Sequence, residues 1–163
     1  VSGAHFNPAV TLMMVLRGHL SARDGVGYVL LQIAGALIGV AAAHAMFDLP
    51  VFTLSQHTRE GASQVFSEFV ATFGLVLVII GSARFDPRST PGSVAAYITA
   101  AYWFTASTSF ANPAVSIARA LTDTFSGIAL TGVPWFIAAE LAGAIIAVLA
   151  AKILFPEHPA TQE

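Results

Sequence analysis

The tetrapeptide Asn-Pro-Ala-Val occurs twice in this chain, at residues 7–10 and 112–115. Asparagine is a favoured N-cap residue. Proline suits the first helical position because its fixed φ fits the turn and its missing N–H would be unpaired there. Asn7-Pro8 and Asn112-Pro113 therefore predict two helix N-termini. Each would present a carboxamide and the positive end of a helix dipole.

The composition places these helix starts in a membrane protein. The chain is 56% hydrophobic and 10% charged, with a mean hydropathy of +0.75, whereas about 25% of the residues of soluble domains are charged. Crossing a bilayer takes about 20 mostly apolar residues. Four runs reach that length, at residues 25–47, 62–83, 92–109 and 131–155. We therefore expect a polytopic, all-α membrane protein.

Two further stretches are too short to cross. Residues 8–18 and 113–124 would each span roughly half a bilayer as helices, and each leads through a polar turn into a full span. Such half-length helices indicate re-entrant segments. Their irregular backbone is tolerated at membrane depth only where it is buried in protein or lines a watery cavity.

The duplication extends beyond the tetrapeptide. Gln32-Ile33-Ala34-Gly35-Ala36 follows the first half-helix, and Glu140-Leu141-Ala142-Gly143-Ala144 follows the second. Small residues at this spacing allow close helix contact in lipid. Because an odd number of crossings separates corresponding points, the two copies are predicted to insert in opposite orientations, as in transport proteins built from inverted repeats.

The cationic residues predict an orientation. Arg17, Arg23, Arg84, Arg88 and Lys152 fall at one set of span ends, which makes the loop at 84–89 cytoplasmic and the loop at 48–61, with Arg59, external. Arg119 lies one helical turn beyond Val115, and we expect it to cap the short helix or reach the interface.

With no cysteine, the chain has neither a disulfide nor a thiolate metal site. The scattered His19, His44, His57 and His158 are predicted to be interfacial or solvated, not metal ligands.

Three segments resemble the aquaporin (major intrinsic protein) family: Ser2-Gly3-Ala4-His5-Phe6-Asn7-Pro8-Ala9-Val10-Thr11, Thr108-Ser109-Phe110-Ala111-Asn112-Pro113-Ala114, and Ser67-Glu68-Phe69-Val70-Ala71-Thr72-Phe73. The resemblance covers essentially the whole chain, except that the family's first two spans are not in it, so we expect an N-terminally incomplete monomer. It implies one domain, residues 1–163, folded as an aquaporin-like right-handed helical bundle with an inverted repeat and two re-entrant half-helices. It further implies a homotetramer in the cell membrane.

The resemblance also implies a pore. Its centre would be formed by Asn7, Pro8 and Ala9 with Asn112, Pro113 and Ala114, and its wall by the extended stretches Gly3, Ala4, His5, Phe6 and Ser107 to Ala111, which includes Phe110. The two helix dipoles would oppose cations there. Permeation of this kind is passive and needs no nucleophile, metal or cofactor, so we expect neither an enzyme nor a nucleic-acid partner.

Selectivity in the family is set by four further positions. Three of them correspond to Ala100, Ser109 and Val115, and the fourth lies in the missing part. Val115 stands where the family ordinarily has arginine, and Ala100 where water channels usually have histidine. The opening should therefore be wide and uncharged, and should pass polyols and neutral metalloid hydroxides such as arsenite, besides glycerol and water. This combination resembles a bacterial subgroup associated with arsenic resistance.

Two carboxyl groups lie inside apolar spans, where an acidic residue usually has a partner. By resemblance, Glu68 accepts hydrogen bonds from backbone N–H groups of a half-helix loop. Gln32, at the repeat position equivalent to Glu140, favours a neutral hydrogen-bonding role for Glu140. Three alternatives stay open: a water-selective aquaporin, a proton-coupled secondary transporter that uses Glu68 or Glu140 as its coupling group, and a non-transporting junctional protein.

Overall fold

The computed structural model describes residues 3–156, and every regular element in that range is a helix. There are six α-helices: α1 (Pro8–Leu16), α2 (Ala22–Met46), α3 (Ala62–Phe85), α4 (Thr90–Phe104), α5 (Pro113–Ala118) and α6 (Val133–Leu154). Two 3-10 turns, η1 (Pro87–Ser89) and η2 (Arg119–Leu121), precede α4 and follow α5. Within the described residues, α2, α3 and α6 are long and apolar enough to cross a membrane. The predicted all-α membrane fold is confirmed.

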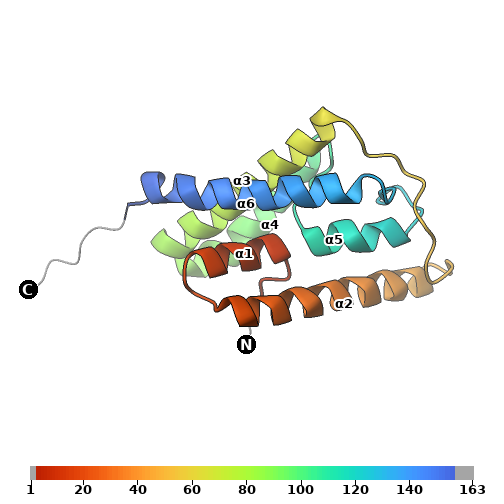
Figure 1. Ribbon diagram of the computed structural model, residues 1–163, viewed down its shortest axis with the longest axis horizontal. Coiled ribbons are helices and arrows are strands. Elements are labelled where there is room, and N and C mark those ends of the chain that lie inside the picture. The colour runs from red at the N-terminus through yellow and green to blue at the C-terminus, as the bar shows by residue number, and fades with distance from the viewer. Residues whose placement is uncertain (1–2, 157–163) are drawn as a thin grey trace, which may run out of the picture.

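The two short helices lie between long ones. In Figure 1, α1 and α5 follow one another along the molecule, with α6 on one side of them, α2 on the other, and α3 and α4 behind. Contacts join α1 and α5 to each other, and each of them to both α2 and α6. The arrangement places the starts of the half-helices in the interior of the bundle.

The helix starts follow local capping. The helix α2 begins at Ala22, three residues before the predicted start, because Ser21 is its N-cap and accepts the N–H of Asp24 through Oγ at 3.1 Å. Proline occupies the first turn of both α4 and α6, where its missing donor has no consequence. The short helices are shorter than predicted, since α1 ends at Leu16 and the turn after α5 ends at Leu121.

Of the four predicted spans, the run at 92–109 differs most from the structure. The helix α4 has 15 residues and ends at Phe104, and Thr105 is already extended, at φ −102° and ψ 140°. The Thr105 hydroxyl donates to the carbonyl of Ala101 at 2.6 Å, which occupies a carbonyl at the helix end. The residues that follow, Thr105 to Ser109, are mostly small and polar, and they form a loop.

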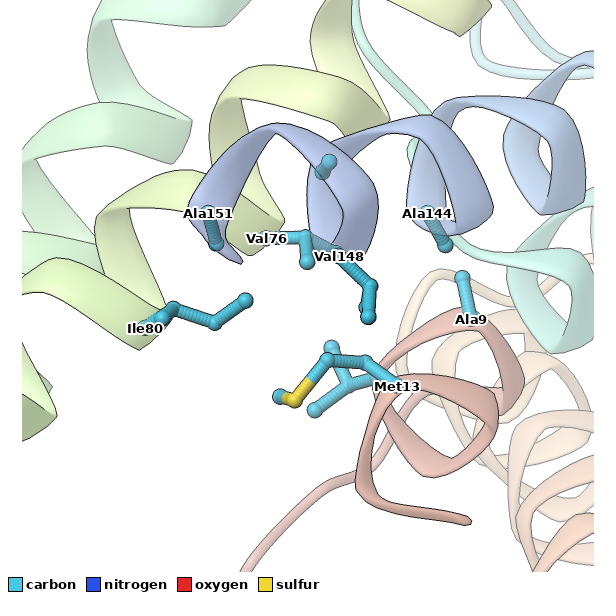
Figure 2. Packing of buried hydrophobic residues seen from close by; sticks show 9 residues of the cluster. Ala9, Met13, Val76, Ile80, Ala144, Val148 and Ala151 are labelled. Carbon is cyan, nitrogen blue, oxygen red and sulfur yellow. The ribbon is translucent and has the colours of Figure 1, made fainter. Parts of the chain in front are cut away.

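The core lies where α1 meets α3 and α6. Figure 2 shows Ala9 and Met13 of α1 facing a row of side chains that includes Val76 and Ile80 of α3 and Val148 of α6. All of these side chains are buried. Between membrane helices the stabilisation comes from close packing, because lipid tails are as apolar as the side chains.

Close contact between α3 and α6 depends on a glycine. A Cβ atom at Gly143 would lie 2.6 Å from the carbonyl oxygen of Phe69, so only glycine permits this approach. The small residues predicted to allow helix contact are thus used on α6. Gly35 and Gly39 on α2 have no described atom within 4 Å of such a Cβ position.

The loop between α2 and α3 packs onto the end of α5. Its amides at Thr53 and Ser55 donate to the carbonyls of Leu121 and Ala120 at 3.0 and 2.9 Å. His44, near the end of α2, is buried, and its Nε2 lies 2.7 Å from the hydroxyl of Thr122. The prediction that His44 is interfacial or solvated is therefore wrong, because the folded loop covers it. His158 lies outside the described residues.

Candidate functional site

The two Asn-Pro-Ala-Val motifs start α1 and α5 as capped helices. The Oδ1 atom of Asn7 accepts the N–H of Ala9 at 2.9 Å, and that of Asn112 accepts the N–H groups of Ala114 and Val115 at 3.0 and 3.3 Å. Both asparagines have extended backbones, with φ of −154° and −160°. Pro8 and Pro113 occupy the first helical turn.

The two caps are hydrogen-bonded crosswise. Nδ2 of Asn7 donates to the carbonyl of Ala111 at 2.7 Å, and Nδ2 of Asn112 donates to the carbonyl of Phe6 at 2.9 Å. Each asparagine thus binds the residue that precedes the other one. Because a carboxamide NH2 has two hydrogens, one donor on each side chain remains beyond this exchange. The positive ends of the two helix dipoles face the same point.

The backbone before each asparagine has the same unusual conformation. The residues four, three and one position ahead of the cap have positive φ in both repeats: Gly3 (78°), Ala4 (52°) and Phe6 (49°), and Thr108 (63°), Ser109 (49°) and Ala111 (48°). Left-handed conformations of residues other than glycine cost about 1–3 kcal/mol each. Because strained backbone clusters at functional sites, its repetition at matching positions indicates that both stretches have a functional role.

Two buried carboxyl groups hold the second of these stretches. Glu68 of α3 accepts the amides of Phe110 at 2.8 Å and Ala111 at 2.6 Å. Glu140 of α6 accepts the next amide, of Asn112, at 3.0 Å and the hydroxyl of Ser116 at 2.8 Å. Both side chains are completely buried. Three consecutive backbone N–H groups are thereby satisfied without water.

The first repeat has the matching contact on α2. Gln32 donates through Nε2 to the hydroxyl of Thr11 at 2.9 Å, and Thr11 follows Asn7 by the same four positions by which Ser116 follows Asn112. The Thr11 hydroxyl also lies 3.2 Å from Nδ1 of His5, whose ring is 5.0 Å from that of Tyr28. Gln32 and Glu140 therefore occupy equivalent places in the two repeats.

The three predicted selectivity positions have different surroundings. Ser109 is buried, and its hydroxyl has no partner among the described residues. Val115 is half-buried, contacts the apolar cluster around Phe110 and Phe136, and lines a hollow of about 550 Å³. Ala100 is exposed on α4 and lines neither this hollow nor the one beside Thr108.

Two arginines that sequence reasoning did not place at the site lie beside the second loop. The guanidinium carbons of Arg119 and Arg59 are 4.3 and 5.1 Å from the ring centre of Phe110. Arg119 is the C-cap residue of α5, as expected, and its backbone N–H donates to the carbonyls of Val115 and Ile117. For Arg59 the sequence held no signal, since its loop carries no motif.

Arg59 binds the two loops at this end of the bundle together. Its side chain donates to the carbonyls of Ser107 at 3.0 Å, Phe125 at 2.9 Å and Gly127 at 2.8 Å. Burial lowers the pKa of Arg59 below its usual value, and the nearby charge of Arg119 lowers it further. Because arginine is the most basic of the side chains, Arg59 stays charged at neutral pH. In residues 3–156 no group of three or more metal-ligating His, Cys, Asp or Glu side chains comes together.

A helical membrane bundle in which two half-helices meet at their N-terminal asparagines defines the class of inverted-repeat channels and transporters. The family model described as "Major intrinsic protein" matches residues 1–105. The chain belongs to the major intrinsic protein family, whose members are integral membrane channels and not enzymes.

Curated relatives extend the match over nearly the whole chain. "Aquaglyceroporin AqpS" of Rhizobium meliloti (strain 1021) is 53% identical over 160 residues, which cover 98% of this chain and 69% of the relative. "Glycerol uptake facilitator protein-like 6" of Lactiplantibacillus plantarum is 32% identical over 170 residues, 96% of this chain and 77% of the relative. "Aquaporin-6" of Rattus norvegicus is 39% identical over 103 residues, 60% of this chain and 36% of the relative.

Proposed function

We propose that this chain forms the pore of a passive channel with a wide filter that lacks arginine at position 115. The solutes are neutral metalloid hydroxides such as arsenite, together with glycerol and water. The observation that carries the proposal is the crosswise pairing of Asn7 with Ala111 and of Asn112 with Phe6. This pairing leaves each asparagine side chain with one N–H donor for a solute. Both donors lie where the positive ends of the α1 and α5 dipoles meet.

The strained stretches before the asparagines supply the acceptors. Positive φ at three of the four residues of each stretch, Gly3 to Phe6 and Thr108 to Ala111, gives these stretches a backbone that is neither helical nor regularly extended and leaves their carbonyl groups outside helix hydrogen bonding. A solute with hydroxyl groups could exchange its hydration for these carbonyls and for the two asparagine donors. A cation would bind these carbonyls but would be repelled by the positive ends of both helix dipoles.

The filter determines which neutral solutes enter. Val115 has no charge and no donor, and Ala100 and Ser109 are small, so this constriction does not select for water by size. The similarity to proteins named aquaglyceroporin and glycerol uptake facilitator supports solutes larger than water. We further propose, on the family resemblance alone, a homotetramer in the plasma membrane with one pore in each subunit.

The deciding experiment is stopped-flow flux into proteoliposomes that contain the protein at its full natural length. We expect arsenite, glycerol and water all to permeate. Val115→Arg should lower arsenite and glycerol permeability by about tenfold or more while water still passes, because arginine narrows the opening and adds a fixed charge. Val10→Arg, at the same place in the first motif, is unsuitable as a control because Val10 is buried in the core. Ile153→Arg, on an exposed face of α6, controls for an added arginine.

Three outcomes would contradict the proposal. Rapid water flux with arsenite and glycerol excluded would identify a water-selective channel instead. Unchanged arsenite flux in Val115→Arg would remove Val115 from the filter. Uptake against a gradient that an ionophore abolishes would favour a proton-coupled transporter.

A further inference from the structure

Arg119 has a charged group without a polar partner. Its side chain is half-buried, and its guanidinium carbon lies 4.3 Å from the centre of the Phe110 ring. Across residues 3–156, no hydrogen bond or ion pair engages this guanidinium. Its five N–H donors are therefore available to a molecule that enters the space beside the guanidinium.

That space joins two hollows at this end of the bundle. The hollow of about 550 Å³ that contains Val115 and a second of about 260 Å³ beside Thr108 share three lining residues: Arg119, Phe125 and Ser126. Tyr102 and Trp103, at the end of α4, line the second hollow as well. Arg119 thus stands at the boundary between the space beside Val115 and the space beside the second loop.

Arg59 lies against the same Phe110 ring as Arg119 but has polar partners of its own. Four contacts engage the Arg59 side chain, with the carbonyls of Ser107, Phe125 and Gly127 and the hydroxyl of Thr108. Arg59 also lies against the same Phe110 ring, which is 6% exposed. The Arg59 guanidinium is thus engaged by three carbonyls and one hydroxyl, whereas the Arg119 guanidinium is available to bind a solute.

We infer that Arg119 is a specificity-determining residue of the channel, one that supplies the positive charge and the hydrogen-bond donors missing at Val115. The inference rests on the proposed function. From this place the guanidinium binds the hydroxyl groups of neutral solutes and repels small cations. The π face of Phe110 holds it in position.

The charge of Arg119 lies away from the position of Val115, and this distance affects the width of the opening. Arg119 follows Val115 by four residues, which is roughly 6 Å along a helix. A charge at this distance does not occupy the constriction at Val115. Charge selection and size selection are therefore separated along the path, and a larger neutral solute can pass both.

The test compares two permeabilities in proteoliposomes that contain the protein at its full natural length: those of glycerol and of guanidinium ion. Arg119→Gln keeps the size and some donors but removes the charge. We expect the ratio of glycerol to guanidinium permeability to fall about tenfold or more, the factor that the loss of a charge-assisted interaction implies. Arg119→Lys should keep most of the cation exclusion. Arg88→Gln, on the exposed turn η1, should leave the ratio unchanged.

A second variant protects the test against misfolding. The exchange Val115→Arg with Arg119→Val moves the charge to the constriction, and we expect it to exclude guanidinium ion at a reduced glycerol permeability. An unchanged ratio in Arg119→Gln, or passage of guanidinium ion through the exchange variant, would overturn the inference while glycerol flux in the wild type still supports the proposed function. A wild type that passes no glycerol would instead contradict the proposed function itself.

Discussion

At the scale of single residues, Glu140 takes the place in the second repeat that Gln32 takes in the first. One oxygen of Glu140 accepts the amide of Asn112 and the hydroxyl of Ser116, and its other oxygen, Oε2, is buried without a donor in the described part of the chain. A neutral acceptor is enough for both contacts. The geometry favours a structural role over proton coupling.

We expect Glu140→Gln to keep both the fold and the solute flux, because the amide oxygen can accept the same two donors. Glu140→Leu leaves those two buried donors unpaired, at about 1–3 kcal/mol each, and should lower stability and flux together. Thermal unfolding in detergent and glycerol flux at several pH values measure both effects. Loss of flux in a stably folded Glu140→Gln protein would support the coupling role instead.

Residue types and spacing predicted the helix caps well, but they predicted poorly the contacts between residues far apart in the sequence. Asn7 and Asn112 are strong local signals, because capping depends on the next three residues. The partners of Arg59 and His44 could not be predicted, since both residues bind loops whose paths depend on how the chain packs around α5. Arg119 caps α5 as expected, but the position of its side chain over Phe110 could not be predicted, because it depends on the path of the loop before α5.

At the scale of elements, the pairing of α3 with α6 depends on the backbone approach at Gly143. We expect Gly143→Ala to lower the melting temperature by roughly 2 to 10 °C, because the added methyl group overlaps the Phe69 carbonyl and forces the helices apart. The matched control is Gly35→Ala on α2, where a Cβ meets no described atom within 4 Å. Equal melting temperatures for the two variants would contradict this role of Gly143.

Helix existence was predictable from hydropathy, and helix ends were predictable only where a cap marks them. The start of α3 at Ala62 agrees with the predicted run, whereas α4 stops at Phe104, five residues before the end of the predicted run. The residues after Phe104 leave the helix because their amides bind to Ser67 and Glu68 of α3. A hydropathy pattern contains no information on such partners.

At the scale of the whole molecule, the crosswise bonds between the two loops favour a fixed centre over a moving one. Alternating access would require one repeat to move against the other, which breaks both asparagine–carbonyl bonds. We therefore expect glycerol flux to rise linearly with the gradient, to be equal in both directions, and to be unaffected by a proton ionophore. Saturation at millimolar glycerol, or a response to the ionophore, would contradict a channel.

The same two bonds set an order for biogenesis. Asn7 is synthesised 105 residues before Asn112, and its partner, the carbonyl of Ala111, is made only just before Asn112. At the usual pace of translation this interval is roughly 5 to 20 s. During that time Asn7, at the start of the first half-helix, is in the membrane without the Ala111 carbonyl that accepts its hydrogen bond. The nascent chain must therefore keep this loop sheltered, by the translocation machinery or by neighbouring helices, until the second half arrives.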